Sequence, residues 1–146
     1  DVERGAIALR AAIQRNEIGI AHTSDAHGNL GTALSMMGRQ DEAAAAYVAS
    51  LKARPSALTH YNLGILLGDT LRVAEAEAHY QAAIQLDPGL EGAHNNLGLL
   101  QANSGRRDEA GESFRRAIAA NPQHAHAFNN LANILRRPDA DEAALR

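Results

Sequence analysis

A Leu-Gly pair recurs along this chain at a nearly constant interval. Its glycines are Gly31, Gly64 and Gly98, spaced 33 and 34 residues apart, and Ala132 follows after a further 34 residues. A glycine inside a helix costs about 1 kcal/mol relative to alanine, so its repetition indicates a packing requirement. A period of this length is typical of helix-turn-helix units stacked in series, because each unit can bury its apolar face only against its neighbours.

The rest of each unit repeats in register with the glycine. In the second copy the glycine is followed by an alanine, an aromatic residue, a small residue and a proline, which are Ala76, Tyr80, Ala83 and Pro88. Small residues let the two helices of a hairpin approach closely, and proline cannot continue the second helix. The polar turn between the helices of the third copy contains Asp108, which we expect to cap the second helix.

Composition favours an all-α fold and argues against several classes of function. Only 3% of the residues are aromatic, and valine, isoleucine and threonine are too scattered to form strands. The formal net charge is −3, with acidic and basic residues interspersed, so we expect no nucleic-acid partner. The absence of cysteine excludes disulfides and fits a reducing compartment. No apolar run approaches the roughly 20 residues of a membrane span, so we expect a cytoplasmic protein without membrane insertion.

Seven features shared by three tandem copies make this pattern resemble the tetratricopeptide repeat family. The resemblance implies a right-handed α-solenoid of helix-turn-helix repeats, with residues 1–146 forming a single domain. The expected units are a lone second helix at 1–17, full repeats at 24–56, 57–90 and 91–124, and a partial repeat at 125–146.

The first and last units depart from the full repeat. In residues 1–17 only the spacing of a second helix is present, carried by Gly5, Leu9 and Ala12. The last unit places its Asp-Glu-Ala motif one residue early and has Pro138 in its turn, which disfavours its second helix. Both ends of the repeat array therefore offer apolar edges.

The seven histidines do not form a metal-binding pattern. His27, His60 and His94 share one repeat position, so the repeat explains them as bulky residues between helices. His124 and His126 are two residues apart, whereas a helical zinc pair is four apart. No Gly-rich phosphate loop and no nucleophile-base pair is recognisable by spacing, so we expect no metal, no cofactor and no catalytic residue.

In the family, one stripe of each first helix lines a concave groove, and the resemblance places an asparagine-rich stripe there. A carboxamide is both donor and acceptor, so a row of them can hold the main chain of an extended peptide with little sequence preference. For any single asparagine, packing between repeats is the alternative role. The predicted groove residues are Asn29, Tyr61, Asn62, Ile65, Asn95, Asn96, Leu99, Asn103, Asn129, Asn130 and Asn133.

One binding mode of the family is not expected here. Members that bind chaperone tails clamp a C-terminal carboxylate with lysine or arginine at three groove positions. The corresponding positions in this chain hold Gly28, Gly92 and Asn96, or Tyr61, His126 and Asn130 in the next register. The cationic donors that such a clamp requires are absent from these positions.

The leading hypothesis is a non-catalytic module that binds a protein partner, either an extended peptide or a helix, in the groove. One alternative is the substrate-recruiting region of a larger enzyme, because Asn-rich repeats of the His-Asn-Asn-Leu-Gly type are similar to those of O-GlcNAc-transferase-like bacterial protein glycosyltransferases. A second alternative is a self-assembling scaffold in which the apolar ends of the solenoid stack into homo-oligomers.

Overall fold

The computed structural model describes residues 1–15 and 20–136, and over these ranges it confirms the all-α prediction. The described residues form eight helices joined by turns, with no strand. The helices group into two compact units, Asp1–Leu86 and Asp87–Arg146. The second helix of the last repeat, expected after residue 137, lies outside the described residues.

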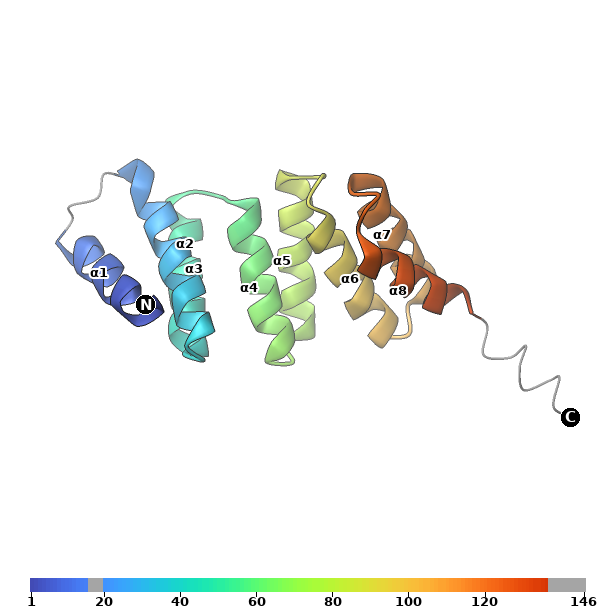
Figure 1. Cartoon of the computed structure of the whole chain (residues 1–146), viewed down its shortest axis with the longest axis horizontal. Helices are drawn as coiled ribbons and strands as arrows, with labels where there is room; N and C mark the ends of the chain where they lie inside the picture. Colours follow the sequence, from blue (N-terminus) through green and yellow to red (C-terminus); the bar gives the residue numbers. More distant parts are fainter. Residues whose placement is uncertain (16–19, 137–146) are drawn as a thin grey trace, which may run out of the picture. The chain divides into compact units, whose positions relative to one another are not determined.

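The first unit contains five helices that pack in chain order. They are α1 (Val2–Gln14), α2 (Ile20–Met36), α3 (Gln40–Ala53), α4 (Ala57–Asp69) and α5 (Val73–Leu86). The helices α2 and α3 form one hairpin and α4 and α5 a second, while α1 packs on α2 and α3 packs on α4 (Figure 1).

The second unit repeats the same arrangement with three helices. They are α6 (Glu91–Asn103), α7 (Arg107–Ala120) and α8 (Ala125–Leu135). The helices α6 and α7 form a hairpin, and α8 packs mainly on α7 and also contacts α6. The first helix of the last repeat is therefore present as predicted.

One turn geometry closes all three hairpins. The backbone N–H of an arginine bonds to a carbonyl five residues earlier, and the residue before the arginine has a positive φ, as in the Schellman motif. The N–H···O distances are 2.9 Å for Arg39–Leu34, 2.9 Å for Arg72–Leu67 and 2.8 Å for Arg106–Gln101. The residues with positive φ are Gly38 at 73°, Leu71 at 60° and Gly105 at 77°.

The same arginines begin the second helices. Arg106 precedes α7, its backbone carbonyl accepts from Ala110, and its guanidinium pairs with Glu109 at 3.4 Å. Asp108 therefore lies inside the first turn of α7, and the expectation that its side chain caps the helix is wrong. Its charge still complements the positive end of the helix dipole.

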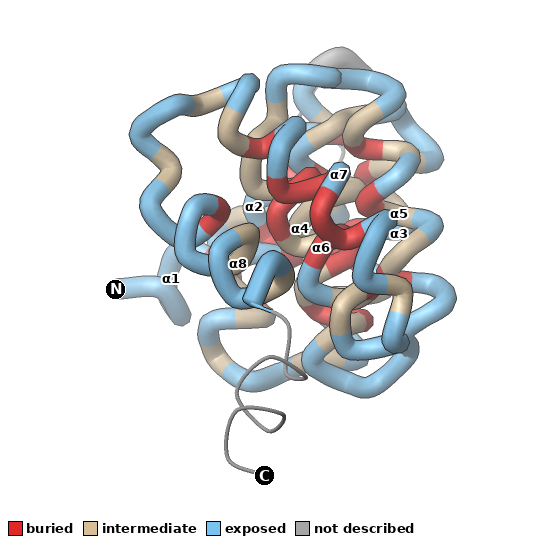
Figure 2. Tube along the Cα trace, turned by 90° about the vertical axis from the view of Figure 1, so that its right-hand side faces the viewer, coloured by how far each residue is buried: buried red, intermediate tan, exposed pale blue. Residues whose placement is uncertain are grey.

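Each hairpin is closed by contact between the repeated glycine and an aromatic ring. A Cβ added to Gly98 would lie 2.6 Å from Cε1 of Phe114, which is closer than real Cβ contacts allow. The same clash is present in the other hairpins at Gly31–Tyr47 (2.6 Å) and Gly64–Tyr80 (2.7 Å). Figure 2 shows buried residues gathered along the inner sides of the paired helices. The structure thus confirms that glycine is repeated because the second helix occupies the space of its side chain.

Candidate functional site

Asparagines of the second unit gather on one face of two first helices. Their spacing of three to four residues places side chains on one side of a helix. We call this surface the amide face, and it consists of Asn95, Asn96, Leu99 and Asn103 of α6 with Asn129, Asn130 and Asn133 of α8.

A hydrogen bond joins the two halves of the amide face. Nδ2 of Asn130 donates to Oδ1 of Asn95 at 2.9 Å, and Nδ2 of Asn95 donates to Oδ1 of Asn96 at 3.3 Å. Asn95 is buried, with 7% of its surface exposed. Asn95 therefore acts as a packing residue that connects α6 with α8, which is the alternative role considered for a single asparagine.

The other members of the amide face reach the surface. Asn103, Asn129 and Asn133 are exposed, Asn96 is half-buried, and Leu99 is 39% exposed. Because a carboxamide both donates and accepts, these side chains can pair with the N–H and C=O groups of an extended main chain. Leu99 supplies an apolar contact beside them.

The predicted groove residues of the first unit lie on α2 and α4. Asn29 is exposed, and Tyr61, Asn62 and Ile65 are half-buried. The ring of Tyr61 is tilted by 47° against that of Tyr80 of α5, with 6.1 Å between their centroids. Tyr61 is therefore positioned by the hairpin behind it.

Sequence reasoning missed a histidine pair in the second hairpin. Nδ1 of His60 on α4 lies 2.8 Å from Nδ1 of His79 on α5, so one ring donates and the other accepts. Burial lowers the pKa of both rings, and the charge of His79 lowers that of His60 further. The repeat pattern does not reveal this pair, because the position of His79 holds Ala46 in the first repeat and Ser113 in the third.

The repeated histidines fill their positions to different extents. His94 is buried, with Nε2 2.9 Å from the backbone oxygen of Pro88, while His27 and His60 are half-buried. The slot expected from the repeat is thus closed fully only in the third copy. In the last copy Phe128 takes this position and is 47% exposed.

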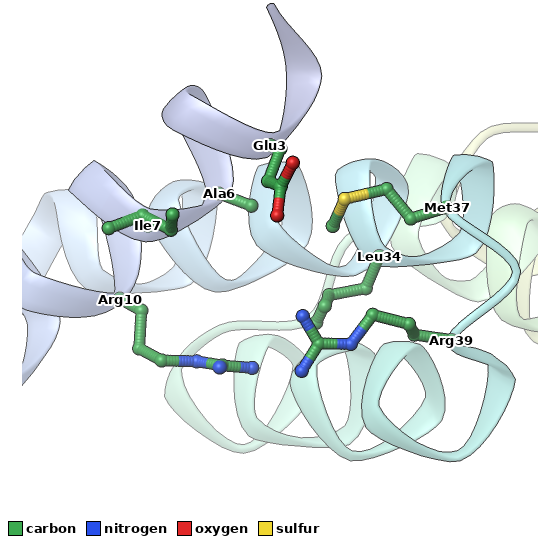
Figure 3. Close-up of a pocket in the computed structure, with 7 residues that line it drawn as sticks. All are labelled: Glu3, Ala6, Ile7, Arg10, Leu34, Met37 and Arg39. Atoms are coloured by element: carbon green, nitrogen blue, oxygen red, sulfur yellow. The ribbon is translucent and has the colours of Figure 1, made fainter.

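A small cavity lies between α1 and the α2–α3 turn (Figure 3). It measures about 90 Å³, with Ala6, Leu34 and Met37 at its apolar part and Arg10 and Arg39 at its rim. Both arginines pair with Glu42, at 2.8 and 2.6 Å, and the hydrogen bond from Arg39 is the main reason that the pKa of Glu42 is lowered. A cavity of this size can hold water but not a peptide segment.

The described residues contain neither a cluster of three metal-ligating side chains nor a membrane-spanning helix. Within residues 1–15 and 20–136, no three His, Asp or Glu side chains are grouped as metal ligands would be. Over the same ranges, no helix has the length and apolarity required to cross a membrane.

Many solved structures share this arrangement of helices. PilF of Pseudomonas aeruginosa superimposes with a TM-score of 0.81 at 23% identity, covering 92% of this chain and 60% of that one. The first TPR of Spaghetti (RPAP3), solved with the HSP90 peptide SRMEEVD, gives 0.74 at 21% identity and covers 77% and 90%. This chain has the tetratricopeptide-repeat fold.

YrrB, described as a TPR protein with an unusual peptide-binding site, is also similar, with a TM-score of 0.75 at 24% identity, covering 91% of this chain and 67% of that one. The family model for the tetratricopeptide repeat matches residues 29–91, and the model for the Est1 DNA/RNA binding domain matches residues 76–145. No curated protein matches the chain.

Proposed function

We propose that this chain is a non-catalytic protein-binding module that holds an extended, largely uncharged peptide on the amide face. The observation that carries the proposal is the hydrogen bond of 2.9 Å between Asn130 and Asn95. It fixes the asparagine-bearing sides of α6 and α8 next to each other, while Asn96, Asn129 and Asn133 remain accessible on either side.

The proteins with the same fold support binding of a peptide, but the residues of this chain favour a recognition chemistry other than a carboxylate clamp. The first TPR of RPAP3 was solved with the acidic HSP90 peptide SRMEEVD, and YrrB is described as having an unusual peptide-binding site. A carboxylate clamp requires lysine or arginine, and the matching positions of the second unit hold Gly92 and Asn96 in one register and His126 and Asn130 in the next. Main-chain pairing by carboxamides is the recognition that these residues can provide.

The proposal is tested by titrating the full chain with a panel of short neutral peptides and with N-methylated copies of the tightest binder. N-methylation removes the main-chain N–H donors without changing the side chains. If the amides hold the main chain, methylation of alternate residues abolishes binding. Binding that survives methylation throughout would refute this mode of recognition.

Asparagine variants separate a binding role from a packing role. We expect Asn129→Ala and Asn133→Ala, both at exposed positions, each to weaken peptide binding about fivefold to tenfold, the effect of one hydrogen bond, without changing the melting temperature. Gln85→Ala removes an exposed amide of α5 and serves as the matched control that leaves affinity unchanged. Asn130→Ala should instead lower stability, because it leaves Oδ1 of the buried Asn95 without its donor.

Nucleic-acid binding is the competing function suggested by the Est1 match. Residues 76–145 contain six arginines and nine acidic residues, and no lysine. Arg115 and Arg116 both pair with Glu112. Because affinity for nucleic acid depends on neutralising successive phosphates, we expect no binding of DNA or RNA oligonucleotides at physiological salt in a fluorescence anisotropy titration.

The substrate-recruiting hypothesis is a narrower form of the same proposal. It requires the preferred ligands to be unstructured segments rich in serine and threonine. A peptide panel in which serine and threonine are replaced by alanine distinguishes substrate recruitment from recognition of the main chain alone. Recognition of the main chain alone predicts equal affinities for the original and the substituted peptides.

A further inference from the structure

Two histidines from different helices direct their ring nitrogens at each other in the second hairpin. His60 lies on α4 and His79 on α5, and their Nδ1 atoms are 2.8 Å apart. The ring centroids are 5.1 Å apart, and the ring planes are inclined by 35°. We call these two residues the histidine pair. Because neutral imidazole is a common ligand of zinc, copper and nickel, two of its nitrogens at this distance can serve as a chelating pair.

The separation of the two nitrogens suits the binding of a single ion. A metal–nitrogen bond is about 2.0–2.1 Å long, so two nitrogens on one ion lie about 2.9 Å apart at a right angle and about 3.3 Å apart at the tetrahedral angle. The observed distance of 2.8 Å therefore has to open by only about 0.5 Å or less. Rotation of the rings about χ2, a torsion with broad preferences, can provide this opening and turn both lone pairs toward the ion.

Binding of an ion leaves both rings neutral. In the present hydrogen bond one ring carries its hydrogen on Nδ1 and the other accepts with Nδ1. When the ion binds, the donor ring releases this hydrogen to water and takes one up from water at Nε2, so that no proton is gained or lost overall. Burial lowers the pKa of both rings, so protons compete little with the ion near neutral pH.

The hairpin fixes the histidine pair in position. The residues that follow each histidine, Tyr61 and Tyr80, also contact each other, with 6.1 Å between their ring centroids. Tyr80 is buried against Gly64, where an added Cβ would lie 2.7 Å from the ring. Successive contacts between α4 and α5 therefore set the distance between the helices. Ligands carried by two packed helices are held more precisely than ligands on a loop.

The surroundings of the histidine pair leave the other coordination positions to water. Both rings are half-buried, so one side of the pair reaches solvent. Among the residues that the structure describes, no third His, Asp or Glu is grouped with them as a ligand. Glu75 and Arg72 act on His79 with opposite charges, and they pair with each other at 2.6 Å. The site therefore suits an exchangeable ion with water in its open positions.

Of the three hairpins, the second combines two histidines at these positions. His27 and His94 stand at the position of His60 in the first and third hairpins, but the position of His79 holds Ala46 and Ser113 there. The members of the pair are 19 residues apart, so the i, i+4 spacing of a zinc pair within one helix does not reveal them. The first hairpin supplies a natural control, because His27 faces an alanine position.

We propose that the histidine pair binds one divalent ion of the late transition metals. Cu²⁺ should bind most tightly and Ni²⁺ and Zn²⁺ less so, following the Irving–Williams order. Mg²⁺ and Ca²⁺, which prefer oxygen ligands, should not bind. The ion joins α4 to α5, so it stabilises the second hairpin according to its occupancy. The site is separate from the amide face, which lies in the second unit, and does not depend on peptide binding.

The test uses Zn²⁺ alone as the probe, added to the full chain in a buffer without chelators. NMR of the ring protons follows the seven histidines separately, and calorimetry gives the stoichiometry. We expect one ion per chain, with the first ring signals to shift being those of His60 and His79. The melting temperature should rise with Zn²⁺ and return to its original value when EDTA is added. An equal concentration of Mg²⁺ should have no effect.

Asparagine variants remove a ligand while retaining a hydrogen-bonding group near the position of Nδ1. His79→Asn should therefore fold like the wild type but bind Zn²⁺ at least about tenfold more weakly. The rise in melting temperature with Zn²⁺ should be lost in the same variant. His27→Asn, at the matching position of the first hairpin, is the control that should retain the wild-type affinity.

The titration of the wild type decides the proposal even if a variant fails to fold. Ring signals of His60 and His79 that stay unmoved at millimolar Zn²⁺ would overturn it. Shifts confined to other histidines would indicate adventitious binding at the surface and would overturn it as well. If the variants fold, wild-type affinity in His79→Asn or loss of affinity in His27→Asn would place the ion elsewhere.

Discussion

At the scale of single residues, the turn between α4 and α5 departs from its counterparts. Leu71 has φ 60° and is 84% exposed, whereas the other two turns place glycine at this position. The left-handed conformation costs a non-glycine residue about 1–2 kcal/mol, and an exposed leucine regains little of this by burial. The second hairpin is therefore held in its turn against a local strain.

We predict that Leu71→Gly stabilises the chain by about 0.5–1 kcal/mol, because relief of strain exceeds the added entropy of the unfolded chain. Chemical denaturation measures the change. The reciprocal variant Gly105→Leu should destabilise by a similar amount. A lower denaturation midpoint for Leu71→Gly would show that Leu71 makes a stabilising contact instead.

The His60–His79 pair gives the second hairpin a dependence on pH. The pKa of both rings is lowered, mainly by burial, so the unfolded chain binds more protons than the folded one below the ordinary pKa of 6.5. The contribution of the pair is full above that value and is lost as the pH falls toward the folded-state pKa. Protonation of both rings also removes the acceptor of their hydrogen bond.

Between about pH 7 and pH 5, we therefore expect His79→Leu to lose about 1 kcal/mol less stability than the wild type does. This amount is the net contribution of one hydrogen bond. Melting temperatures of the wild type and the variant at a series of pH values provide the measurement. His22→Leu, at an exposed position of α2, is the control that should leave the wild-type slope unchanged. Parallel pH profiles for the wild type and His79→Leu would argue against a role for the pair.

At the scale of helices, the contact between glycine and ring is the unit that closes each hairpin. We predict that Gly98→Leu destabilises the chain by about 1–3 kcal/mol, because its side chain would overlap Phe114. Gly98→Ala should be partly rescued by Phe114→Leu, since the smaller side chain frees the space that the new Cβ needs. Denaturation of the two single variants and the double variant measures this coupling, and simple additivity would contradict it.

The hairpins were predictable from sequence because each depends on residues at fixed distances within one repeat. The glycines, the aromatic residues and the small residues all stand where the period placed them. Asp108 was misassigned because the capping rule was applied without knowing that Arg106 forms the turn. The role of Asn95 was not predictable, since its partner Asn130 lies 35 residues away in a different repeat.

At the scale of the molecule, the chain consists of two units with different surfaces. The first carries the histidine pair and the Tyr61–Tyr80 contact, and the second carries the amide face. The sequence predicted which helices bear the asparagines, because helical spacing alone determines this. It did not predict which of them are accessible, because accessibility depends on packing between α6 and α8. That packing buries Asn95 and leaves Asn133 exposed.

NMR of the side-chain NH₂ groups provides a direct test of whether the amide face holds a peptide main chain. On addition of a neutral peptide that binds, we expect shifts at Asn96, Asn129 and Asn133, with the signals of Gln81 and Gln85 on α5 unmoved. Peptide binding with these three asparagine signals unmoved, and shifts confined to other helices, would contradict it.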